Sequence, residues 1–136
     1  MIVVDTNVLA YLYFPSSQNS AVEELYKKNS LWIVPPLWRS EFRNIAALYF
    51  RKGLLSYEHI QDAMIKAEEL VWGYEEPVKS DEVFALIKKS ACSAYDCEFV
   101  ALAVRLNVPL LTYDKKILQE FPEIAVTVEI YLGSHK

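Results

Sequence analysis

Apolar positions along the chain occur either in short unbroken runs or at intervals of three and four residues. The short runs predict buried strands at residues 2–4, 31–34, 108–113 and 125–132. The stretches with helical spacing predict helices at residues 7–14, 20–29, 37–52, 57–72, 81–90, 94–107 and 114–121. Strands therefore alternate with groups of one to four helices along the sequence.

Residues that start and end helices support these boundaries. Pro35 and Pro36 end the second strand and open the next helix, which Gly53 closes. The pattern predicts an α/β fold in which helices cover both faces of a parallel sheet, in a single domain spanning residues 1–136. The N-terminal caps of four helices are expected to be Ser20, Ser56, Ser80 and Ser93.

The composition is that of a globular protein. Hydrophobic residues make up 53% of the 136 residues, and the net charge of −4 is not typical of a protein that binds nucleic acid over its whole surface. A local basic patch or a bound metal could still bind nucleic acid. No apolar run approaches the ~20 residues of a membrane helix. Cys92 and Cys97 lack metal spacing, and we expect reduced thiols in a cytoplasmic protein.

Two aspartates follow apolar strands directly. Asp5 comes after the strand Ile2–Val4, and Asp114 follows "PLLTY". Ligands gather beyond the carboxyl ends of parallel strands, so both residues are candidates for a shared site. Each one taken alone is also a plausible cap of the helix that follows it.

Glu41 lies inside the apolar stripe of a predicted helix. It precedes Ile45 by four residues, and a glutamate on the core side is costly unless it is paired or bound to a cation. Either Arg39 or Arg43, which flank it, could be a structural ion-pair partner.

Asp96 shares a helix face with Val100 and Ala103. It could instead be an acidic residue that the helix dipole favours in a first turn. Glu98 points elsewhere, and we interpret it as a solvated charge.

Four inward-facing carboxylates would repel one another unless a cation lay among them. Oxygen ligands suit Mg²⁺ or Mn²⁺, which can activate water for attack on a phosphodiester. The sequence thus raises the hypothesis of a metal-dependent phosphodiesterase.

The segments "IVVDTNVLA", "WRSEFRN", "AYDCEFVALA" and "LLTYD" resemble the acidic motifs of the PIN domain. Their order and the chain length are similar to those of VapC toxins of type II toxin–antitoxin modules. The resemblance implies a three-layer α/β/α sandwich with a mostly parallel sheet of about five strands. It also implies a Mg²⁺- or Mn²⁺-dependent endoribonuclease whose catalytic acids are Asp5, Glu41, Asp96 and Asp114.

The resemblance implies roles for these residues. Asp5, Asp96 and Asp114 would hold the metal, with Glu41 binding directly or through water, and Asn7 and Thr112 would support them. Some relatives carry a further acid after the last aspartate, whereas two lysines stand there in this chain. Four basic residues could guide the RNA backbone, although the lysines could equally be a solvated helix start: Arg39, Arg43, Lys115 and Lys116.

The same resemblance implies a VapB-type antitoxin partner that covers the acidic site, and a homodimer. Two related alternatives remain open, namely a PIN-domain nuclease of RNA processing or decay without an antitoxin, and a non-catalytic interaction module. A short upstream gene for a DNA-binding antitoxin would favour the toxin.

Other classes of site fit less well. A haloacid-dehalogenase-type phosphatase needs a second aspartate where Asn7 stands, and a response-regulator receiver needs an acceptor aspartate after a central strand. His59 and His135 lack a second histidine or cysteine at ligand spacing, which disfavours zinc.

Overall fold

The computed structural model describes residues 1–134 and contains a parallel sheet flanked by helices. Its strands are β1 (Ile2–Val4), β2 (Trp32–Ile33), β3 (Leu110–Leu111) and β4 (Ala125–Val126). They lie in the order β2-β1-β3-β4, and every pairing is parallel. The predicted α/β class with a parallel sheet is therefore confirmed, but within residues 1–134 the sheet has four strands rather than about five.

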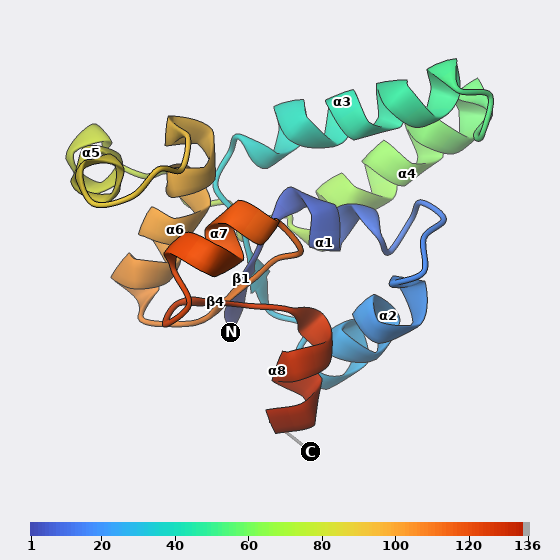
Figure 1. Ribbon diagram of the computed structural model, residues 1–136. Helices are drawn as coiled ribbons and strands as arrows, with labels where there is room; N and C mark the ends of the chain where they lie inside the picture. The colour runs from blue at the N-terminus through green and yellow to red at the C-terminus, as the bar shows by residue number, and fades with distance from the viewer. Residues whose placement is uncertain (135–136) are drawn as a thin grey trace.

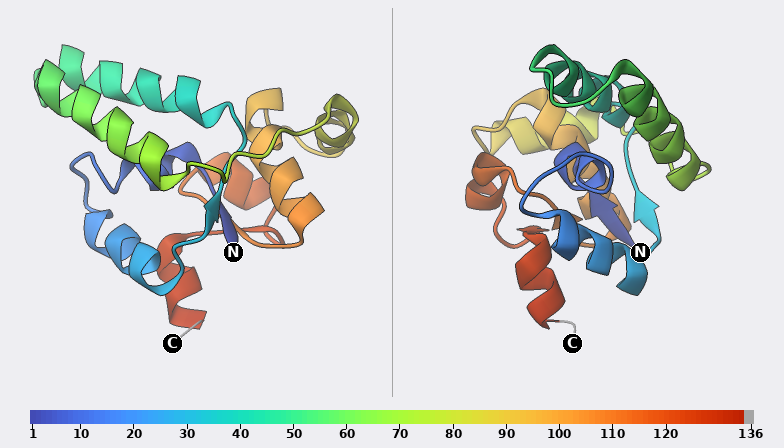
Figure 2. Two further views of the ribbon diagram at one scale, coloured as in Figure 1. Left: turned by 180° about the vertical axis from the view of Figure 1, so that it is seen from behind. Right: turned by 90° about the vertical axis from the view of Figure 1, so that its right-hand side faces the viewer.

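Helices pack around this sheet in separate groups. Helix α6 lies against β1 and β3, and α5 packs on α6. Helices α3 and α4 run side by side as a hairpin that extends away from the sheet, and α2 lies beside α8 (Figures 1 and 2). The helices are α1 (Thr6–Ala10), α2 (Asn19–Lys28), α3 (Trp38–Arg51), α4 (Tyr57–Leu70), α5 (Ser80–Lys88), α6 (Ala94–Leu106), α7 (Lys115–Glu120) and α8 (Val128–Ser134).

The strands form the centre of the hydrophobic core. Residues Ile2–Val4 are completely buried, as are Leu110 and Leu111. Strands buried on both faces need apolar residues at every position, which explains why unbroken apolar runs predicted them. None of the helices that residues 1–134 form is long and apolar enough to cross a membrane.

The prediction of a last strand over residues 125–132 is wrong beyond Val126. Thr127 begins a turn, because its Oγ1 accepts a hydrogen bond from the backbone N–H of Ile130 at 3.3 Å and its carbonyl accepts one from Tyr131 at 3.0 Å. These bonds start α8 (Val128–Ser134). Residues 125–132 are rich in β-branched side chains, but the local threonine cap decides their conformation.

The helix caps agree with the sequence in part. Ser56 and Ser93 cap α4 and α6, and Gly53 adopts a φ of 73° after α3, as predicted. Ser20 lies inside α2, because the side chain of Asn19 fixes the preceding loop by bonds to the carbonyls of Tyr11 and Phe14. Lys79 rather than Ser80 is the N-cap of α5, and α1 ends at Ala10 rather than Phe14.

Candidate active site

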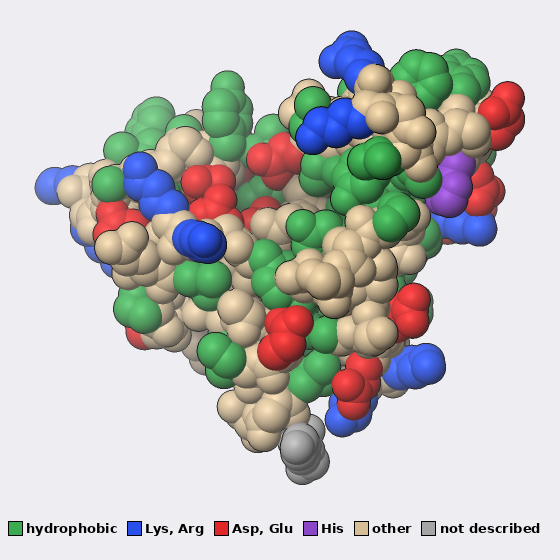
Figure 3. Space-filling model, turned by 45° about the vertical axis from the view of Figure 1, so that its right-hand side comes forward, with side chains coloured by type: hydrophobic (Ala, Val, Ile, Leu, Met, Phe, Trp, Pro, Cys, Tyr) green, Lys and Arg blue, Asp and Glu red, His purple; other side chains and the backbone are tan. Residues whose placement is uncertain are grey.

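Four acidic residues from four different segments line one pocket. The pocket has a volume of about 600 Å³ and lies beyond the carboxyl end of β1. Figure 3 shows acidic side chains gathered in a hollow near the top of the molecule, with basic side chains beside them. The pocket is lined by Asp5, Thr6, Asn7, Leu37, Ser40, Glu41, Asn44, Ile45, Tyr95, Asp96 and Asp114.

Asp5 is the most enclosed of these acids, with only 7% of its surface exposed. Its Oδ1 accepts a hydrogen bond from the backbone N–H of Thr6 at 2.8 Å. Its Oδ2 accepts bonds from the hydroxyl of Thr112 at 2.7 Å and from Nδ2 of Asn7 at 3.3 Å. Burial raises the pKa of Asp5 to about 6, despite the opposing effect of these bonds.

Glu41 projects from α3 toward the same pocket. Its Oε1 accepts a hydrogen bond from the hydroxyl of Thr6 at 2.7 Å. Burial, with the added repulsion of Asp5, Asp96 and Glu98, raises the pKa of Glu41 to about 7. A carboxyl group with this pKa can gain or lose a proton near neutral pH.

Asp96 lies in the first turn of α6, and Asp114 lies directly before α7. Burial and the nearby charge of Asp114 raise the pKa of Asp96. Asp114 caps α7, since its Oδ1 accepts a bond from the backbone N–H of Ile117 at 2.9 Å. Asp114 is thus also a helix cap, which was the alternative explanation for both aspartates. Asp5 caps α1 in the same way, because it accepts a bond from the backbone N–H of Thr6. Capping leaves the other carboxylate oxygen of Asp114 available to the pocket.

Asn7 and Thr112 join the two strand ends that carry the aspartates. Thr112 is completely buried, and its hydroxyl accepts a bond from the backbone N–H of Asp114 at 3.0 Å while it donates to Asp5. Asn7 donates to Asp5, and its Oδ1 accepts a bond from the N–H of Tyr113 at 3.2 Å. These contacts are consistent with the supporting role expected for both residues.

Sequence reasoning missed Thr6, which links two of the acids. Its backbone N–H binds Asp5 and its hydroxyl binds Glu41. The only signal was a threonine directly after a strand-end aspartate. It also missed Ser40, Asn44 and Tyr95 in the lining of the pocket.

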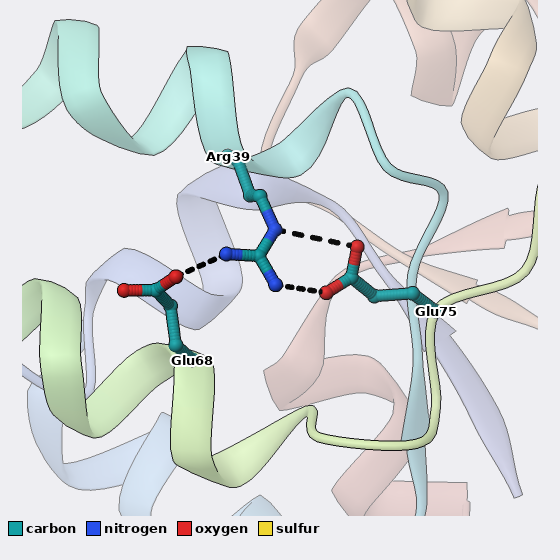
Figure 4. Close-up of polar contacts among 3 residues, drawn as sticks. All are labelled: Arg39, Glu68 and Glu75. Carbon is teal, nitrogen blue, oxygen red and sulfur yellow. Dashed lines mark hydrogen bonds and ion pairs between the residues drawn. The ribbon is translucent and has the colours of Figure 1, made fainter.

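Arg39 does not face the pocket. Its guanidinium binds both carboxylate oxygens of Glu75, with an Nη2–Oε1 distance of 2.5 Å, and also binds Glu68 of α4 (Figure 4). Arg39 is therefore a structural ion-pair partner, although of Glu68 and Glu75 rather than of Glu41. This arrangement does not support the role expected for Arg39 along the RNA backbone.

The other three basic candidates are exposed. Lys115 and Lys116 begin α7 next to Asp114, and the charge of Lys116 opposes the rise in the pKa of Asp96. Arg43 makes no ion pair with any of residues 1–134. These positions stay compatible with contact to a phosphate backbone.

Comparison with known proteins supplies the deciding observation. Residues 2–124 match the family described as the PIN domain. The chain belongs to the PIN-domain family. Its sequence is 28% identical to that of Ribonuclease VapC3 of Pyrobaculum aerophilum over 128 residues. The aligned region covers 90% of this chain and 96% of that protein.

The fold of this PIN domain is similar to that of a solved structure. A chain in the crystal structure of FitAcB from Neisseria gonorrhoeae superposes with a TM-score of 0.74 at 17% identity, over 95% of this chain and 99% of that one. The resemblance to the PIN domain and to VapC is thereby confirmed. The four acids that carried the resemblance lie in one pocket of this fold.

The PIN-domain pocket offers oxygen donors of the kind that Mg²⁺ and Mn²⁺ prefer. Among residues 1–134, no group of three aspartate, glutamate, histidine or cysteine side chains is arranged closely enough to hold a metal ion. His135 lies outside the described residues. The raised pKa values of Asp5, Glu41 and Asp96 indicate that their charges lack compensation. The donor chemistry therefore fits a divalent cation, and binding one would require the carboxylates to reorient.

The raised pKa of Asp5 predicts a specific pH dependence of stability. Because the folded pKa of about 6 exceeds the usual 3.8, protonated Asp5 stabilises the fold at low pH, and this contribution is lost as the pH rises through 6. We compare the free energies of unfolding of the wild type and of Asp5→Asn in the absence of divalent metal. As the pH rises from about 4 to about 8, the wild type should lose about 2 kcal/mol more than Asp5→Asn does.

Urea unfolding of both proteins over this pH range measures the difference. The exposed Asp62 of α4 provides the control, because Asp62→Asn should leave the pH profile of the wild type almost unchanged. Parallel profiles for the wild type and Asp5→Asn would contradict the raised pKa of Asp5.

The ion pairs of Arg39 predict a structural effect that Arg43 does not share. Arg39→Ala leaves the carboxylates of Glu68 and Glu75 without their cation, and should lower the free energy of unfolding by about 1 kcal/mol. Arg39→Lys should recover part of this loss, because lysine keeps the charge and lacks the planar fork. Arg43→Ala should change the free energy by less than about 0.5 kcal/mol in the same urea titration. Equal effects of the two alanine variants would exclude a special role for Arg39.

Proposed function

We propose that this PIN domain is a metal-dependent endoribonuclease of the VapC type. The observation that carries the proposal is the meeting of Asp5, Glu41, Asp96 and Asp114 in one pocket at the carboxyl edge of the sheet. Its similarity to Ribonuclease VapC3 supports RNA as the substrate. The oxygen donors of the pocket support Mg²⁺ or Mn²⁺ as the cofactor.

In this proposal the four acids have different roles. Asp5, Asp96 and Asp114 would hold the cation, with Glu41 binding directly or through water. When bound, a divalent cation would offset the acidic charge and polarise the phosphodiester and the water that attacks it. Glu41, which lines the same pocket, would accept a proton from that water where it is not itself bound to the cation. Thr6, Asn7 and Thr112 orient the carboxylates of Glu41 and Asp5.

Substitution of the acids tests the proposal. Asp96→Asn and Asp5→Asn should each lower the rate of RNA cleavage in Mg²⁺ by at least about a hundredfold, because each removes a charged ligand. The wild type should lose its activity in EDTA and regain it when Mg²⁺ or Mn²⁺ is added in excess.

The measurement is cleavage of a labelled total-RNA preparation by protein purified without any partner. Asp62→Asn, an exposed substitution of the same kind on α4, should cleave at the wild-type rate. Wild-type cleavage by Asp96→Asn, or full activity in EDTA, would overturn the assignment of the acids.

We further propose an antitoxin as the protein partner and a homodimer as the assembly. Large apolar side chains that are exposed on and around the α3–α4 hairpin support a protein interface there, as surface aromatic and aliphatic groups favour such contacts. They are Leu48, Phe50, Leu54, Tyr57, Ile65 and Trp72.

Expression in bacterial cells tests the partner. The wild-type chain alone should arrest growth, Asp96→Asn should not, and co-expression of the protein encoded beside this gene should restore growth. Growth at the normal rate with wild-type protein that cleaves RNA after purification would contradict a toxin, and would favour a nuclease of RNA processing or decay.

A further inference from the structure

An exposed aromatic ring lies at the edge of the acidic pocket. Tyr95 lines the pocket from the first turn of α6, next to Asp96, and 64% of its surface is exposed. It makes no side-chain hydrogen bond or ring contact with any other of residues 1–134. The ring is therefore available for contact with a ligand in the pocket.

The wall of the pocket that α3 forms offers polar groups that are also unpaired. Ser40 and Asn44 of α3 line it, and neither side chain makes a hydrogen bond within the described chain. Leu37 and Ile45 contribute apolar surface to the same wall. The asparagine amide has both donors and an acceptor, so it can bind the edge of a planar heterocycle.

We propose that Tyr95 and Asn44 form a binding subsite for one nucleobase of the substrate, beside the phosphodiester that is cleaved. The base stacks on the ring of Tyr95, while Asn44, with Ser40, binds its edge. Because Tyr95 adjoins Asp96, a base on this ring belongs to a nucleotide whose phosphate can reach the acids. This inference rests on the proposed ribonuclease function and assigns it a substrate contact.

A stacked base must first leave its own helix. The edges of bases in duplex RNA are paired and their faces are stacked, so the subsite accepts only an unpaired nucleotide. Stacking on aromatic side chains supplies affinity that does not depend on charge. This property suits a pocket whose walls carry four acids and would otherwise repel RNA.

The first experiment measures binding of a fluorescently labelled single-stranded oligoribonucleotide by anisotropy, with Ca²⁺ in place of Mg²⁺. Tyr95→Ala should raise the dissociation constant about tenfold, whereas Tyr95→Phe should bind like the wild type. Tyr74→Ala is the matched control, since Tyr74 is 41% exposed and lies outside the pocket. An unchanged dissociation constant for Tyr95→Ala would overturn the proposal.

The second experiment identifies the base that is bound. An abasic nucleotide is placed at each position of the oligoribonucleotide in turn. At one position it should weaken binding of the wild type about tenfold and should not weaken binding of Tyr95→Ala further, because the same contact is already lost. Additive losses at every position would show that Tyr95 does not stack on a base.

The same experiments separate this inference from the proposed function. A protein that cleaves no RNA in Mg²⁺ or Mn²⁺ but passes the abasic test would refute the nuclease and keep the subsite. Cleavage at the wild-type rate, with unchanged KM, by both Tyr95→Ala and Asn44→Ala would keep the nuclease and refute the subsite.

Discussion

The burial of neighbouring carboxylates in one pocket is the constraint on which this structure depends. A parallel sheet brings the carboxyl ends of β1 and β3 to one edge, so Asp5 and Asp114 meet there whatever charge they carry. Hydrogen bonds from Thr6, Asn7 and Thr112 hold Asp5, yet burial still raises its pKa to about 6. The site therefore destabilises the metal-free fold near neutral pH, and the buried strands beneath it must offset that cost.

Much of the remaining structure fixes where these acids point. The carboxylates of Asp5 and Asp114 also cap α1 and α7, so the start of each helix orients an acid. Helix α3, which carries Glu41, is also linked to the sheet through Glu75. Glu75 forms a parallel bridge with Val34 at the end of β2, and Arg39 of α3 binds the same Glu75. This ion pair thus adds a link between α3 and the edge of the sheet to the packing of the buried Trp38 and Phe42 in the core.

Features encoded by local pattern could be predicted from the sequence, and features that depend on distant partners could not. Unbroken apolar runs indicated the strands, and Glu41 inside an apolar stripe indicated an acid that faces inward, as its place in the lining of the pocket shows. The partners of Arg39 lie 29 and 36 residues away in sequence, and no local pattern identifies them. The hydrogen bond from Thr6 to Glu41 spans 35 residues. At residues 125–132 the cap formed by Thr127 starts a helix although the composition favours a strand. The spacing of apolar residues gives no sign of such a cap.

The acidity of the pocket also limits how this PIN domain can bind a polyanion. The whole chain carries a net charge of −4, and Arg39 is engaged with Glu68 and Glu75 away from the pocket. In the proposed ribonuclease, attraction to RNA would come from cations bound by the acids and from the exposed lysines at the start of α7. Contacts that do not depend on charge would then add to affinity. The exposed ring of Tyr95 beside the acids would meet this need, since in the proposed subsite it would stack on a base whose phosphate reaches the acidic pocket.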